Sequence, residues 1–158
     1  MDFLIELLLY SSNFLSFSWY LLMITITQKL VDDMISHSRE ENPNECCGIL
    51  SGSNEDITKI YRIKNLTPSP YRYVMDPKEQ MDAERDSDSL GLSFIAFYHS
   101  HTHTPAYPSD TDVRMAQESG WLDFHYVLVS LEDDENPVVN FFLVDFDGNV
   151  SQVEYKVV

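Results

Sequence analysis

The pattern of apolar and polar positions predicts a set of short strands interrupted by three helices. Alternating or continuous apolar runs of strand length stand at 24–28, 46–52, 56–66, 92–100 and 124–131, and in a hairpin over 138–157. Helices are expected over 28–41, over 77–87 and over 109–119. Pro77 suits a first helical position, Ser109 a cap, and Gly120 a stop. This order predicts a mixed sheet flanked by helices, an α+β sandwich.

The first 22 residues do not fit this pattern. The stretch "MDFLIELLLYSSNFLSFSWYLL" is apolar, carries only Asp2 and Glu6 as charges, and is nearly long enough to span a bilayer. A signal peptide would need a basic start, yet no basic residue precedes Lys29. Met23 opens a sequence typical of a domain start. We therefore expect a domain over 23–158, with 1–22 outside it or not translated at all; a membrane-associated or docking helix is the alternative.

Charge and cysteine usage narrow the function classes. The chain of 158 residues fits one domain and has 26 acidic against 10 basic residues, a formal net charge of −16. Such a surface repels phosphate backbones and anionic headgroups, so nucleic acid and membrane are not expected as partners. The two cysteines, Cys46 and Cys47, are adjacent in an expected strand and so point to opposite faces. Without a disulfide framework, a reducing, cytoplasmic location is indicated.

Three histidines alternate in "AFYHSHTHTPAYPSDTD", residues 96–112. Alternate side chains of a strand share a face, so His99 and His101 should point the same way at the end of an apolar strand. His103 would join them only if the strand continued, and the prolines of the next loop argue against that. Two imidazoles and the carboxylate of Asp112 would form a three-ligand set suited to zinc, with a fourth position for water.

The same residues also fit a helix start without metal. Ser109 followed three residues later by Asp112 is a capping box. The metal site is favoured because buried imidazoles that end an apolar strand are costly without a partner. Glu45 precedes the buried strand "CCGILSG" and is the candidate base for a metal's water; otherwise it is a solvated residue at the strand edge.

The spacing of these residues resembles the signature of the JAMM (MPN-plus) zinc metalloproteases. That signature has a glutamate before "CGIL", then "HSH", seven residues, a serine, two residues and an aspartate. The segments "PNECCGILSG" and "YHSHTHTPAYPSDTD" are most similar to the small single-domain bacterial and archaeal members, and the resemblance covers about 23–158. It implies a three-layer α/β/α-like sandwich around a curved mixed sheet, of the MPN and cytidine-deaminase type. Thr102 departs from the proline common in relatives, which puts the rigidity of that loop in doubt.

Carried over position by position, the resemblance implies roles for five residues. His99, His101 and Asp112 would hold one Zn²⁺ per chain. Glu45 would be the general base that activates the zinc-bound water, and Ser109 would steady the oxyanion. The implied reaction is therefore zinc-dependent hydrolysis of a peptide or isopeptide bond.

The resemblance also implies the kind of substrate. It is the bond after the C-terminal diglycine of a ubiquitin-like or sulfur-carrier protein, and a homodimer is open as a further partner. The brief extended segment "YRYVMD" (71–76) would offer a strand edge to such a tail.

Three other functions are weighed against this one. The first is a non-catalytic MPN-type scaffold, which keeps the fold but loses ligands. The second is a mononuclear iron oxygenase, whose usual ligand spacing differs. The third is a Cys-His protease with Cys46 or Cys47 as nucleophile, for which a buried strand is a poor setting. Of the remaining histidines, His37 and His125 are expected to be structural, and His103 is expected in a loop near the cleft.

Overall fold

A computed structural model describes residues 23–158. The expectation for residues 1–22 lies outside this range. The described chain forms three helices and one sheet of eight strands in the order β7-β6-β5-β4-β2-β3-β1-β8. The elements are, in chain order, β1 (Ile24–Ile26), α2 (Gln28–Glu41), β2 (Cys47–Ser53), β3 (Asp56–Ile63), α3 (Pro77–Ser89), β4 (Ser93–His101), α4 (Asp110–Ser119), β5 (His125–Ser130), β6 (Val138–Val144), β7 (Val150–Val153) and β8 (Tyr155–Val157).

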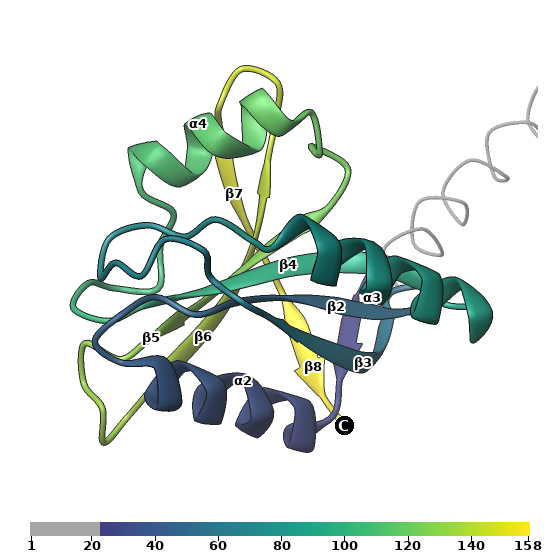
Figure 1. The fold of residues 1–158 in the computed structure, drawn as a ribbon, viewed down its shortest axis with the longest axis horizontal. Coiled ribbons are helices and arrows are strands. Elements are labelled where there is room, and N and C mark those ends of the chain that lie inside the picture. The colour runs from purple at the N-terminus through teal and green to yellow at the C-terminus, as the bar shows by residue number, and fades with distance from the viewer. Residues whose placement is uncertain (1–22) are drawn as a thin grey trace, which may run out of the picture.

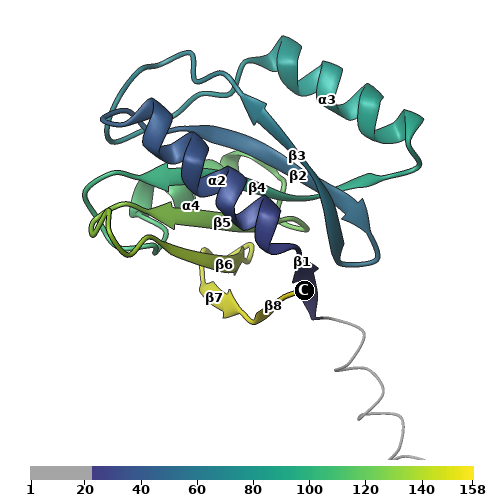
Figure 2. The same cartoon turned by 90° about the horizontal axis from the view of Figure 1, so that it is seen from below.

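The helices cover both faces of the sheet (Figures 1 and 2). On one face, apolar side chains of α2 such as Met34 join a core that includes Leu50 and Tyr98. On the other face, Ala83 of α3 packs with Phe97, and a separate cluster contains Ala116 of α4. Strand pairs are parallel at β4–β5, β1–β3 and β1–β8 and antiparallel elsewhere. The α+β prediction of a mixed sheet between helical layers is confirmed.

The sheet is strongly curved because its two outer strands are almost consecutive in the chain. Only Glu154 separates β7 from β8, which lie at opposite ends of the eight-strand order. A flat sheet of this width would hold its edges about 33 Å apart. Two peptide steps reach only about 7 Å. The sheet therefore curls enough to bring the end of β7 close to the start of β8, in agreement with the curved sheet that the resemblance implied.

Most boundaries shift by one or two residues from the sequence expectation, and two differences are larger. The hairpin expected over 138–157 turns at Gly148, with φ of 82°, but its second arm splits. β7 pairs with β6, and β8 instead pairs with β1. The strand expected over 56–66 ends at Ile63, and the chain over 64–76 then crosses the end of the sheet with a single bridge between Asn65 and Met75. Among residues 23–158, no helix has the length and apolar content needed to cross a bilayer.

A buried contact ties α2 to the strand that carries the first two candidate ligands. The hydroxyl of Tyr98 in β4 lies 2.7 Å from Nδ1 of His37, in line with a structural role for that histidine. Position 48 must be glycine here, because a Cβ would lie 2.2 Å from Cε1 of Tyr98 and 2.4 Å from the Tyr61 carbonyl oxygen. The glycine of "CCGIL" thus makes room for the tyrosine.

His37 should make the stability of the protein sensitive to mild acid. Burial and, second, the charge of Arg62 lower the pKa of His37 from 6.5 to about 4. The unfolded chain therefore binds the proton first, so the contribution is complete above about pH 6.5 and is lost as pH falls toward 4. We expect His37→Gln to remove about 3 kcal/mol of the acid-dependent loss of unfolding free energy. Urea unfolding at pH 7, 6, 5 and 4 measures it.

The matched control for this variant is His103→Gln, which changes an exposed histidine. It should follow the wild-type pH dependence. If His37→Gln showed the same acid dependence as the wild type, the assignment of the effect to His37 would be wrong.

Candidate metal centre

Three donor side chains converge where β4 ends and α4 begins. Nε2 of His99 lies 3.2 Å from Nε2 of His101, and each of these atoms lies 3.3 Å from one oxygen of Asp112. Both histidines are buried, and only 13% of the Asp112 side chain is exposed. The strand supplies the histidines on one face because they alternate, and the helix supplies the carboxylate from its first turn.

The chemistry and spacing of these donors fit a zinc ion. Nitrogen and oxygen ligands lie about 2.0–2.2 Å from zinc, and tetrahedral corners at that radius are about 3.4 Å apart. The separations of 3.2 and 3.3 Å are near this value, and the two distances to Asp112 run to its two different oxygens. One ligand atom from each residue lies within 4.8 Å of the other two, and residues 23–158 contain no other such group of three.

Asp112 caps its helix and faces the histidines at the same time. The backbone N–H and the hydroxyl of Ser109 each donate to Oδ2 of Asp112 at 2.7 Å, while the N–H of Asp112 donates to the Ser109 hydroxyl at 3.2 Å. The capping box and the metal site are therefore not alternatives. Burial would raise the pKa of Asp112, but His99, His101 and Ser109 together outweigh it and hold the pKa far below its usual range.

The orientation of His101 is fixed by a second hydrogen bond. Its Nδ1 lies 2.9 Å from the carbonyl oxygen of Pro105, which can only accept, so Nδ1 carries the proton. In the neutral ring Nε2 then presents its lone pair to the cluster, as a metal ligand requires. His99 is held differently. Its ring packs against Tyr73 at a centroid distance of 4.6 Å, and its Nδ1 has no partner within the described residues.

Glu45 lies on the same face of the sheet as the cluster. The antiparallel register pairs Cys47 with His99, which places Glu45 opposite His101, two residues before the start of β2. Glu45 is only 4% exposed, and no residue of 23–158 donates a hydrogen bond to its carboxylate. Burial, with a smaller contribution from Asp112, raises the pKa of Glu45 against the opposing effect of the two histidines. A buried carboxylate with a raised pKa is suited to accept a proton.

Other residues considered from the sequence lie apart from this cluster or are unsuited to its chemistry. His103 is exposed in the loop after β4. Thr102 is buried with no partner for its hydroxyl among residues 23–158. Burial raises the pKa of both Cys46 and Cys47, which keeps the thiols protonated and disfavours a cysteine nucleophile.

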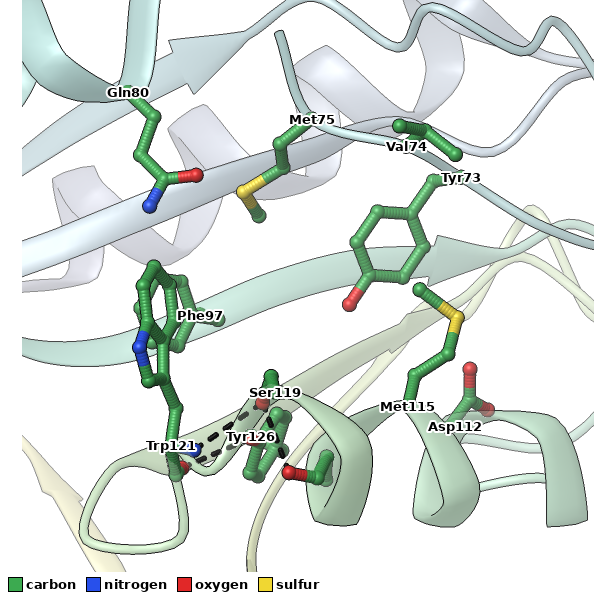
Figure 3. Close-up of a pocket in the computed structure, with 11 residues that line it drawn as sticks. Tyr73, Val74, Met75, Gln80, Phe97, Asp112, Met115, Ser119, Trp121 and Tyr126 are labelled. Carbon is green, nitrogen blue, oxygen red and sulfur yellow. Dashed lines mark hydrogen bonds between the residues drawn. The ribbon is translucent and has the colours of Figure 1, made fainter. Parts of the chain in front are cut away.

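A pocket of about 330 Å³ adjoins Asp112, and the sequence did not predict it. Figure 3 shows Tyr73 and Met75 above it, Phe97 and Trp121 at one end, and Met115 at the other. These side chains come from residues 64–76, called here the crossing segment, from β4, and from α4 and the loop after it. Nothing in the sequence marks them as neighbours, because long-range packing alone brings them together.

Residues 27–144 match the family described as prokaryotic homologs of the JAB domain. This chain belongs to that family. This chain has relatives whose names state an activity. It is 35% identical to the CysO-cysteine peptidase of Mycobacterium tuberculosis over 138 residues, 86% of this chain and 92% of that protein. It is 30% identical to the desampylase of Haloferax volcanii over 106 residues, 63% of this chain and 74% of that protein.

Solved structures agree with the family assignment. The solution structure of a Desulfitobacterium hafniense protein is 37% identical to this JAB domain, covers 86% of it and 93% of its own chain, and superposes with a TM-score of 0.76. A crystal structure of a JAB1/MPN domain protein from Archaeoglobus fulgidus, 20% identical with a TM-score of 0.57, covers 87% of this chain and 99% of its own. The second likeness confirms the MPN-type fold and carries no more than that.

Proposed function

We propose that this JAB domain is a zinc-dependent peptidase or isopeptidase. It cleaves the bond after the C-terminal diglycine of a ubiquitin-like or sulfur-carrier protein. The observation that supports this most is the convergence of two buried imidazoles and a carboxylate near a buried glutamate whose carboxylate has no hydrogen-bond partner among residues 23–158. The names of two relatives, a peptidase and a desampylase, support hydrolysis of a carrier conjugate.

His99, His101 and Asp112 would hold the ion. Bound zinc would polarise the scissile carbonyl and lower the pKa of water to near 7. The chain's own residues do the rest. Glu45 takes the proton of the attacking water and passes it to the nitrogen of the leaving amine, a transfer suited to a carboxylate of raised pKa. The hydroxyl of Ser109, now donated to Asp112, turns toward the developing oxyanion.

The crossing segment offers an edge to an extended tail. Within residues 23–158, neither the N–H nor the carbonyl of Tyr73 has a hydrogen-bond partner, whereas Val74 is paired with Leu66 and Asn65. Tyr71 is 75% exposed and Val74 46% exposed. A tail added here as a strand would run along the pocket beside Asp112.

We place the reaction in the cytoplasm, where the two unpaired cysteines stay reduced. That the protein forms a homodimer stays a prediction, which the mass in solution from light scattering would test.

Cleavage of a defined fusion tests this function. We expect zinc-loaded protein to cut a diglycine-ended carrier from a fused peptide, or from a lysine side chain, after the second glycine. A chelator should stop the cut and added zinc should restore it, with mass spectrometry reading the products. Intact substrates in the presence of stoichiometric zinc would identify a non-catalytic scaffold instead. Iron in place of zinc in the purified protein would point to the oxygenase.

A further inference from the structure

Asn65 has an amide side chain that is fully occupied by the backbone of the crossing segment and by Glu45. Its Nδ2 donates to the carbonyl oxygen of Glu45 at 2.9 Å and to that of Arg72 at 3.4 Å. Its Oδ1 accepts from the N–H of Thr67 at 2.9 Å and from that of Val74 at 3.0 Å. An amide offers two N–H donors and two acceptor sites, so none is left over. Asn65 thus joins three separate stretches of backbone.

The backbone of Glu45 depends on this region on both sides. Its N–H donates to the carbonyl of Ser69 at 2.8 Å, and its carbonyl accepts from Asn65. Its carboxylate receives no hydrogen bond from residues 23–158, so no side-chain contact of that kind fixes it. The position of the carboxylate is therefore set by the backbone that carries it, and that backbone is held by residues 65 and 69.

Two further bonds of the Asn65 amide hold residues 72–74 over the pocket. Arg72 and Val74, which flank Tyr73, are both bonded to Asn65. The Tyr73 ring packs on His99 at 4.6 Å and forms one wall of the pocket together with Val74 and Met75 (Figure 3). One side chain consequently sets the place of the candidate base and of the wall that a substrate tail would meet.

We propose that Asn65 is a positioning residue of this active site. It fixes Glu45 relative to the cluster of His99, His101 and Asp112, and it fixes the segment 72–74 over the pocket. The proposal rests on the proposed hydrolysis. Asn65 touches neither the metal nor the reacting bond; it acts through the backbone of Glu45 and the segment that carries Tyr73.

Two variants of Asn65 test this in the carrier-fusion assay. Asn65→Ala removes all four bonds, and Asn65→Asp keeps the shape but turns an acceptor toward two carbonyls. We expect kcat per bound zinc to fall about 10- to 100-fold in the alanine variant and further in the aspartate variant, since small displacements near the reaction are this costly. KM should rise a few-fold because the pocket wall is released. Zinc should stay at one ion per chain.

The control is Asn149→Ala, which removes an amide bond to Asp145 in the β6–β7 turn. It removes one exposed bond, so it should lower Tm less than Asn65→Ala does and keep wild-type kcat and KM. A merely structural Asn65 would lower the zinc-loaded fraction and leave kcat per zinc and KM unchanged; that result, or loss of zinc or folding in both Asn65 variants, overturns the proposal. Failure of the wild type to cleave would instead remove the proposed function.

Discussion

Replacing Glu45 with glutamine is expected to leave one zinc ion per chain and to lower kcat by about 10³-fold. Glutamine keeps the size of the side chain but cannot take a proton from water. Glu45 is no member of the donor cluster, so the ion should stay. Metal analysis of the purified variant and initial rates on the carrier fusion measure the two effects.

The control for this change is Glu41→Gln at the exposed end of α2. It makes the same chemical change four residues earlier and should keep wild-type kcat. Full activity in Glu45→Gln would remove this residue from the reaction. Loss of zinc from Glu45→Gln would show that the Glu45 carboxylate ligates the ion, although the donor cluster of His99, His101 and Asp112 does not include it.

Replacing Asp112 with alanine is expected to lose the metal and, with it, all measurable cleavage. Each Asp112 oxygen lies 3.3 Å from one histidine, so its removal leaves two ligands. Changing groups that only support a ligand weakens zinc binding 10- to 100-fold, and we expect the loss of a ligand to cost more than about 100-fold. Competition with a chromogenic zinc chelator measures the affinity.

Asp112 also caps α4, so stability needs its own control. Ser109→Ala removes the hydroxyl bonds of the cap while leaving the Ser109 N–H bond and the three donors in place, and should cost about 1 kcal/mol with zinc retained. Asp110→Ala, an exposed acid in the same turn, should change neither zinc affinity nor cleavage. Wild-type zinc affinity in Asp112→Ala would contradict the donor assignment.

The sequence predicted best what short-range rules decide. Ser109 and Gly120 bound α4 as expected, because capping is a contact between near neighbours. The common face of His99 and His101 follows from strand geometry alone. The signature spacing pointed to Asp112, and the structure brings all three together. Their role as ligands stays a prediction, as does that of Glu45.

Long-range pairing explains what the sequence did not predict. The expected strand over 56–66 stops at Ile63, and the side-chain amide of Asn65 forms hydrogen bonds with backbone groups between residues 45 and 74. No local pattern marks a side chain for such partners. The separation of β8 from the hairpin and the pocket beside Asp112 likewise depend on segments distant in sequence.

The pairing of β8 with β1 has a practical consequence for anyone who handles the recombinant protein. The last residues are the neighbours of Ile24–Ile26, and the N–H of Val158 donates to the carbonyl of Ile26. A truncation before Tyr155, or a bulky purification tag fused directly to Val158, would uncover one side of β1. An exposed strand edge can pair with a strand of a second molecule, so we expect such variants to aggregate during purification.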